Sequence, residues 1–196
     1  MILDQEGLSI ARAVVLAASA EGRTLATAES LTGGLLGATI TSVPGASVVY
    51  RGGLITYATD VKATLGGVPD DVLEHHGAVA AETAKALAEG AARQCGADVG
   101  LALTGVAGPA VQEGHPPGTV WLGWSLASGA TGAQLLNLAG TRPEIRAVAV
   151  RRALELALAL LQGDLPPDAL EDPESVVPDA GSVVEPRPAI VDATVE

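Results

Sequence analysis

Helix-like and strand-like segments alternate along this chain, and the alternation restricts its fold more than any other feature of the sequence. Segments typical of helices, alanine-rich or amphipathic, occupy residues 8–20, 35–41, 80–94 and 144–161. Short apolar runs typical of strands occupy residues 24–28, 48–57, 98–103, 119–127 and 133–138, with 48–57 either continuous or broken at Gly52-Gly53. Such alternation favours a central sheet with helices on both faces. Because residues 128–132 join the last two strands as an antiparallel pair, we predict an α/β fold: a three-layer α/β/α sandwich with a central mixed sheet.

The C-terminal segment differs in composition from the rest of the chain. From Asp164 onward it carries nine acidic residues, one arginine and six prolines. Prolines remove backbone donors and like charges repel, so we expect this segment to be disordered. The predicted organisation is one folded domain over residues 1–162, followed by an acidic, proline-rich tail over 163–196.

Charge and cysteine content exclude several classes of protein. The net charge is −12, whereas binding to nucleic acid needs a basic surface, so no nucleic-acid partner is expected. Cys95 is the only cysteine, which excludes an internal disulfide and a cysteine-rich metal site, and we predict neither a metal nor a cofactor. The longest apolar stretches, 11–20 and 153–161, are too short to cross a bilayer, and residues 1–7 lack the basic start of a signal peptide. We therefore expect a soluble, cytoplasmic protein with no membrane partner.

Residues 28–34 form the first candidate site, at a predicted strand-to-helix turn. Free backbone N–H groups at a helix start attract anions, and glycines let a ligand approach. The turn presents a carboxylate, two hydroxyls and two glycines: Glu29, Ser30, Thr32, Gly33 and Gly34. The alternative is an ordinary turn in which Ser30 or Thr32 caps the helix.

Lys62 follows the predicted strand 48–57 and is one of two lysines in a chain with nine arginines. Where charge alone is needed this sequence uses arginine, so a retained lysine points to proton transfer, which arginine cannot perform. A desolvated lysine can act as the general base for a serine hydroxyl. The alternative is a solvated lysine at a helix start.

Two further segments carry groups that suit a phosphorylated ligand. Thr104, Gly105 and Gly108 follow the strand 98–103, and ligands of α/β sheets collect at the carboxyl ends of strands. Arg142 and Arg146 lie one turn apart at the start of the last predicted helix, where a guanidinium can bind phosphate through two hydrogen bonds. The alternatives are a plain glycine turn and a solvated basic face.

Taken together, these segments resemble the CinA C-terminal-domain family. The matching stretches are Ala28-Glu29-Ser30-Leu31-Thr32-Gly33-Gly34, Gly52-Gly53-Leu54-Ile55-Thr56-Tyr57, Lys62, His76-Gly77-Ala78-Val79, Thr104-Gly105-Val106-Ala107-Gly108-Pro109 and Pro117-Gly118-Thr119-Val120-Trp121. They occur in the family's order and cover roughly residues 8–161, and as an ordered set they are highly specific.

The resemblance implies a domain that forms homo-oligomers, dimers or larger, and hydrolyses the carboxamide of nicotinamide mononucleotide without a metal. The family's serine, tyrosine and lysine machinery carries over to Ser30, Ser47, Tyr57 and Lys62. Of the two serines, Ser47 is favoured as the nucleophile and Ser30 as its partner or oxyanion donor. Thr104, Gly105 and the amides of the helix start after Glu29 would then bind the oxyanion or the ribose phosphate of the nucleotide. Arg142 and Arg146 would bind the phosphate.

The sequence departs from the family pattern at two places. Residues 110–117 replace the glycines and Lys-Pro pair usual before Gly-Thr-Val, which matters for affinity if this loop lines the pocket. Ala80 replaces a serine, and a lost N-cap costs about 1 kcal/mol. The resemblance is to the stand-alone form, without an N-terminal pyrophosphatase-type domain. The competing hypothesis is a non-catalytic nucleotide-binding or regulatory protein with the same fold, linked to competence or DNA damage.

Overall fold

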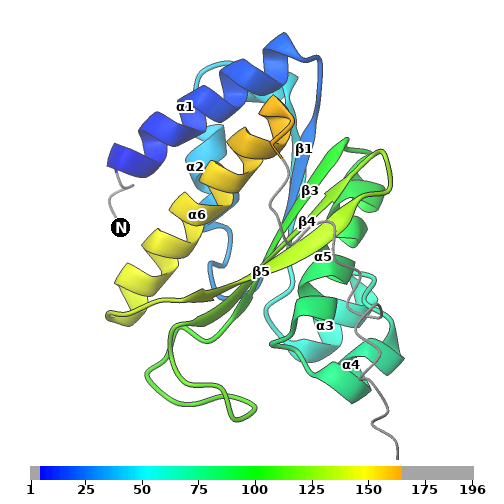
Figure 1. Cartoon of the computed structure of the whole chain (residues 1–196), viewed down its shortest axis with the longest axis vertical. Helices are drawn as coiled ribbons and strands as arrows, with labels where there is room; N and C mark the ends of the chain where they lie inside the picture. Colours follow the sequence, from blue (N-terminus) through cyan, green and yellow to red (C-terminus); the bar gives the residue numbers. More distant parts are fainter. Residues whose placement is uncertain (1–4, 165–196) are drawn as a thin grey trace, which may run out of the picture.

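The computed structural model of the chain describes residues 5–164, which form a five-stranded sheet with helices on both faces (Figure 1). The elements follow in the order α1 (Gln5–Ala20), β1 (Leu25–Glu29), α2 (Leu35–Thr41), the 3-10 helix η1 (Ala46–Val48), β2 (Tyr50–Ile55), α3 (Thr59–Thr64), α4 (Asp70–His76), α5 (Ala81–Cys95), β3 (Val99–Gly105), β4 (Thr119–Leu126), β5 (Thr131–Asn137) and α6 (Arg142–Gln162). The expected tail lies almost entirely outside the described residues.

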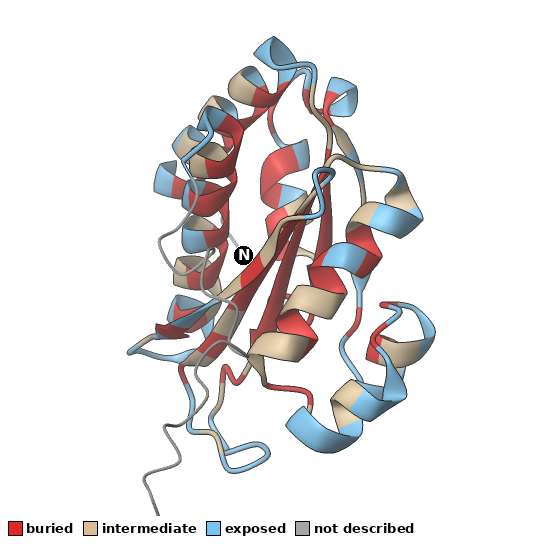
Figure 2. Cartoon of the chain, turned by 45° about the vertical axis from the view of Figure 1, so that its right-hand side comes forward, coloured by how far each residue is buried: buried red, intermediate tan, exposed pale blue. Residues whose placement is uncertain are grey.

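The sheet has the strand order β2-β1-β3-β4-β5. β1 pairs in parallel with β2 and with β3, whereas β4 runs antiparallel to both β3 and β5. α1, α2 and α6 cover one face and α3, α4 and α5 lie on the other (Figure 1). Figure 2 shows the buried residues along the strands and on the helix faces turned toward them. The predicted three-layer sandwich with a mixed sheet is thereby confirmed.

The chain has no phenylalanine, so small side chains must fill the space between the helices and the sheet. The helices therefore pack closely on the sheet. A Cβ atom at Gly100 of β3 would collide with the carbonyl oxygen of Ala88, and one at Gly123 of β4 with that of Ala84. Both alanines belong to α5. The backbone of α5 therefore rests almost directly on the sheet, and no larger side chain fits at either glycine.

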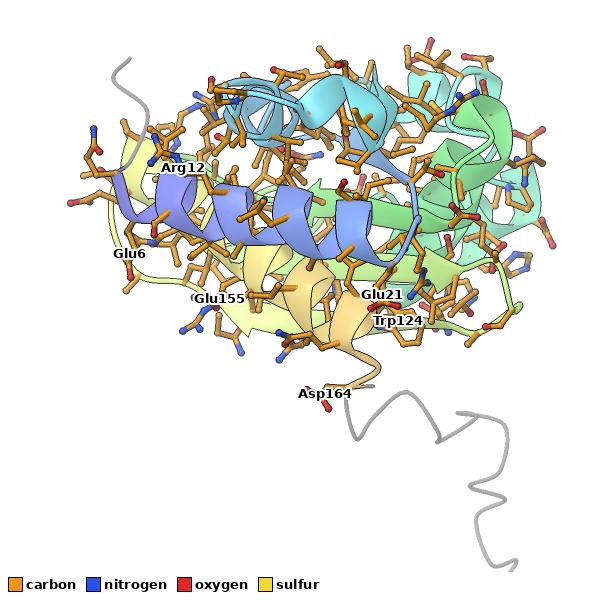
Figure 3. The ribbon with its side chains drawn as sticks, turned by 90° about the horizontal axis from the view of Figure 1, so that it is seen from above. Glu6, Arg12, Glu21, Trp124, Glu155 and Asp164 are labelled. Atoms are coloured by element: carbon orange, nitrogen blue, oxygen red, sulfur yellow. The ribbon has the colours of Figure 1, made fainter. Side chains whose placement is uncertain are left out.

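On the opposite face, α1 lies beside α6 (Figure 3). The Arg151 guanidinium of α6 forms an ion pair of 2.9 Å with the carboxylate of Glu6 in the first turn of α1. α6 begins after Thr141, with proline in its first turn, and ends at Gly163, whose φ of 86° suits a glycine C-cap. Within residues 5–164, no helix is long and apolar enough to cross a membrane.

Three elements add to or refine the sequence predictions. Of the two alternatives for residues 48–57, the continuous strand is correct, and β2 is shorter than that segment because η1 ends at Val48. The sequence analysis did not predict α3 or α4, because each has only six or seven residues and shows little apolar periodicity. The short helix α3 is important for the site, because it carries Lys62.

Candidate active site

The carboxyl ends of the three parallel strands meet at one edge of the sheet, where the structure has a pocket of about 570 Å³. Ser30 follows β1, Tyr57 follows β2, and the loop 106–109 follows β3. These residues line the pocket together with Leu31, Ala58, Thr59, Gly105, Ala110, Val111, Gln112 and Arg142. The volume is within the range of small-molecule sites, and the position is the one that ligands occupy in α/β sheets.

Ser30 lines this pocket and is in direct contact with Lys62, which is buried behind it and does not line the pocket. The Nζ atom of Lys62 lies 2.9 Å from the Oγ atom of Ser30 and donates a second hydrogen bond, of 2.8 Å, to the carbonyl oxygen of Thr56. Ser30 is fixed by its own amide, which donates to the carbonyl of Leu103 on β3. The backbone carbonyl of Thr56 thus orients Lys62, and that of Leu103 orients Ser30.

Lys62 is almost completely buried, with 2% of its surface exposed. This burial disfavours the charged ammonium and lowers the pKa of Lys62 from 10.5 to about 8, while the carboxylate of Glu113 opposes the shift. A lysine with this pKa is partly neutral near physiological pH. It can therefore accept a proton from the serine hydroxyl that it contacts.

Glu29 has a structural role that differs from the substrate contact expected for it. Its carboxylate accepts hydrogen bonds from the amides of Gly34, Leu36 and Gly37, at 2.8 to 3.0 Å. The start of α2 is therefore an anion site that the chain fills with its own carboxylate. Gly33 and Gly34, with φ of 57° and 91°, shape the turn. In this arrangement Glu29 accepts these helix-start amides, and their contact with a substrate stays a prediction.

Tyr57 and Arg142 meet at the rim of the pocket. The Arg142 guanidinium donates hydrogen bonds to the Tyr57 hydroxyl, at 2.9 Å, and to the Gly108 carbonyl, at 2.8 Å. Tyr57 remains 60% exposed. This contact joins the loop after β2, the loop after β3 and the start of α6, so the predicted tyrosine and arginine come together, although not against Lys62.

Three other predicted residues support the pocket from behind. The Thr104 hydroxyl donates to the carbonyl of Ala78 at 2.6 Å, and Arg146 donates to the carbonyl of Thr32 at 2.7 Å. None of the three lines the pocket. The Thr32 hydroxyl and the Arg146 Nε atom are buried and have no hydrogen-bond partner among the described residues.

Ser47 lies away from this pocket. It belongs to η1, which precedes β2, and β2 runs parallel to β1. Ser30 follows the opposite end of β1, so the five residues of that strand separate the two serines by about 17 Å, at 3.3 Å per residue. Ser47 is exposed and lines a separate pocket beside Tyr50. Within one chain, the serine placed against Lys62 is Ser30, in contrast to the nucleophile favoured from the sequence.

The sequence analysis missed the Thr56 carbonyl, the apolar wall around Ala107 and Pro109, and Glu113. A backbone acceptor has no sequence signature, and Glu113 lies in the loop that departs from the family pattern. Because Ala110, Val111 and Gln112 line the pocket, this divergent loop does form part of the site. Among residues 5–164, no three His, Cys, Asp or Glu side chains are grouped to hold a metal ion.

The fold and the site define the class of the protein: an α/β domain in which a serine at a strand-end pocket contacts a buried lysine. Residues 8–161 match the model of the CinA C-terminal domain. The chain is 49% identical over 140 residues to a CinA-like protein of Frankia casuarinae, an alignment covering 71% of this chain and 32% of that protein. It is 45% identical over 157 residues to a competence-damage inducible protein of Limosilactobacillus fermentum, with coverage of 80% and 38%.

Solved structures give the same result. The competence/damage inducible protein CihA of Agrobacterium tumefaciens superposes with a TM-score of 0.78 at 33% identity, over 82% of this chain and 98% of that one. A CinA superfamily protein of Escherichia coli superposes with a TM-score of 0.75 at 32% identity, over 83% and 94%. The chain belongs to the CinA C-terminal domain family. It spans about a third of the length of the two curated relatives described above.

Proposed function

We propose that this domain hydrolyses the carboxamide of nicotinamide mononucleotide to nicotinate mononucleotide and ammonia, with Ser30 as the nucleophile and Lys62 as the general base. The observation that carries the proposal is the 2.9 Å contact between Ser30 Oγ and a buried Lys62 Nζ. A lysine with only a structural role at a helix start would keep its ammonium group exposed to water. It would also need no contact with a serine hydroxyl. The family resemblance supplies the substrate class.

The reaction proceeds in two balanced steps. Neutral Lys62 accepts the hydroxyl proton of Ser30, and the serine oxygen attacks the carboxamide carbon. Lys62 then returns the proton to the departing nitrogen, which leaves as ammonia and yields an ester of Ser30. Water attacks this ester with Lys62 again as base, and Lys62 then returns the proton to the serine oxygen as it leaves. This step releases nicotinate mononucleotide and regenerates the Ser30 hydroxyl. No metal takes part in either step.

Backbone geometry supports this chemistry at the developing oxyanion. The amide of Leu31 directly follows the nucleophile. Leu31 lines the pocket, and its amide donates to no acceptor among the described residues. In strand–nucleophile–helix turns of other hydrolases, the amide after the nucleophile stabilises the oxyanion. We assign the same role to Leu31, in place of the α2 amides that Glu29 occupies.

The pocket also offers surfaces for the remainder of the nucleotide. Ala107, Pro109 and Val111 present an apolar wall for the pyridine ring, and Arg142 at the rim presents a guanidinium for the phosphate. Arg142 is held by Tyr57 and Gly108, so its donors are ordered before the ligand arrives. Arg146 is directed to Thr32 and acts only as a support of the turn that carries Ser30.

The test is to incubate the purified chain with nicotinamide mononucleotide and to measure ammonia with and without EDTA. The proposal expects equal release in both, because Ser30 and Lys62 perform the chemistry. Loss of activity in EDTA that zinc restores would contradict the mechanism. Absence of turnover in a folded protein that still binds the nucleotide would favour the regulatory alternative.

A further inference from the structure

The tip of the divergent loop is a tight hairpin turn with an unfavourable residue in it. Gln112 and His115 exchange two backbone hydrogen bonds, of 3.1 and 2.9 Å, around Glu113 and Gly114. The φ angles of the two central residues are 51° and 80°. A two-residue turn with both φ angles positive favours Asn-Gly or Gly-Gly, and glutamate in this region is uncommon and strained.

The side chain of Glu113 accounts for this unfavourable conformation. Its Oε2 atom accepts a hydrogen bond of 2.8 Å from the Ala78 amide, in the segment that leads into α5. The contact spans 35 residues of sequence and holds the tip of the loop against the main body of the domain. The part of the same loop that lines the pocket, Ala110 to Gln112, directly precedes Glu113. Backbone strain at one residue thus coincides with an anchor for a wall of the pocket.

Burial lowers the pKa of Lys62, and the negative charge of Glu113 raises it in partial opposition. The other charged groups near these elements are directed elsewhere. Glu29 accepts the α2 amides, and Arg142 contacts Tyr57 and Gly108 at the rim. Asp60 on α3 is exposed, and His76 at the end of α4 faces Glu82 at 3.6 Å.

We propose that Glu113 is a positioning residue for the site of Ser30 and Lys62, because its carboxylate anchors the pocket-lining loop to the Ala78 amide at the expense of a strained backbone. Its role in turnover rests on the proposed function, whereas its effect on Lys62 does not. If Glu113 served only to form the turn, replacing it by asparagine would relieve the backbone strain at no cost to the site. If Glu113 positions the site, the same replacement should impair the site.

The direct test is an NMR titration of the full chain labelled at lysine, which is simple because Lys62 and Lys85 are the only lysines. The variant Lys62→Arg assigns the signal. In Glu113→Gln the side-chain oxygen can still accept from Ala78, but the charge is gone, so the Lys62 midpoint should move to lower pH. Glu74→Gln, on neighbouring α4, removes an equal charge and should leave the midpoint unchanged. An unchanged or raised midpoint in Glu113→Gln would overturn the proposal.

Kinetics with nicotinamide mononucleotide then separate charge from anchoring. Glu113→Gln should extend activity to lower pH with little change in KM. Glu113→Asn suits the turn but is too short to reach Ala78, and it should raise KM about fivefold, the equivalent of one hydrogen bond of about 1 kcal/mol. An asparagine variant with the wild-type KM and pH profile would refute the positioning role. If the chain proves inactive on this substrate, the titration still decides whether Glu113 acts on Lys62.

Discussion

Replacing Lys62 by methionine should change how stability depends on pH, because the buried ammonium is costly only where it is protonated. The pKa of Lys62 in the folded chain is about 8, against 10.5 for the ordinary side chain. A folded-state pKa below the unfolded value means that the cost is fully present below pH 8 and is relieved as the pH rises toward 10.5. At about 1.4 kcal/mol per pKa unit, the cost is about 3 kcal/mol at pH 7 and about 1 kcal/mol at pH 10.

The methionine variant lacks this cost but leaves the oxygen atoms of Ser30 and Thr56 without their donor. Each such loss amounts to about 1 to 3 kcal/mol, so at pH 7 the two effects largely cancel. The pH dependence does not cancel, because the two oxygens do not titrate between pH 7 and 10. Relative to the variant, the wild type should therefore gain about 2 to 3 kcal/mol of unfolding free energy between pH 7 and pH 10.

Urea denaturation of both proteins at pH 7 and pH 10, at one ionic strength, measures this difference. Burial raises the pKa of Tyr50 to about 12, but Tyr50 is common to both proteins and drops out of the comparison. Unfolding free energies that run parallel from pH 7 to pH 10 would refute the account of Lys62 as a desolvated base.

Three further substitutions test separate parts of the site and of the fold. Lys62→Arg keeps the charge but cannot accept a proton, so ammonia release should disappear while nucleotide binding, followed by calorimetry, persists; a variant with a third of wild-type turnover would exclude Lys62 as the base. Arg142→Ala should raise KM for nicotinamide mononucleotide more than it lowers kcat, and should hardly affect use of nicotinamide riboside; equal losses on both substrates would contradict the phosphate assignment. Ala80 occupies the N-cap of α5 without a side-chain hydrogen bond, so Ala80→Ser should raise the unfolding free energy by about 1 kcal/mol in denaturant titrations, and a decrease would show that the hydroxyl does not reach an amide.

Much of the fold and part of the site could be predicted from the sequence. Residues 24–28, 98–103 and 144–161 carry strong local patterns, and the corresponding elements β1, β3 and α6 lie within a few residues of their predicted ends. The choice of lysine over arginine at position 62 indicated a role in proton transfer, and the structure places that lysine in a buried contact with Ser30. In these cases a local physical requirement determines the residue type.

The remaining features depend on contacts between distant segments. The carboxylate of Glu29 fills the start of α2, which sequence reasoning had left open for a ligand. The parallel direction of β2 carries Ser47 to the opposite edge of the sheet, and residue spacing along the chain cannot show this direction. The contact of Glu113 with Ala78 likewise arises only when the loop folds back onto the domain.

The assignment of the nucleophile is the central claim, and the most direct test compares ammonia release from nicotinamide mononucleotide by Ser30→Ala and Ser47→Ala. Each variant removes one serine hydroxyl, from the pocket in Ser30→Ala and from an exposed position of η1 in Ser47→Ala. Each variant therefore serves as the control for the other. The account predicts a loss of about 1000-fold or more for Ser30→Ala, in line with the removal of nucleophiles elsewhere, and near wild-type turnover for Ser47→Ala. Substantial turnover by Ser30→Ala, together with inactivity of Ser47→Ala, would contradict it.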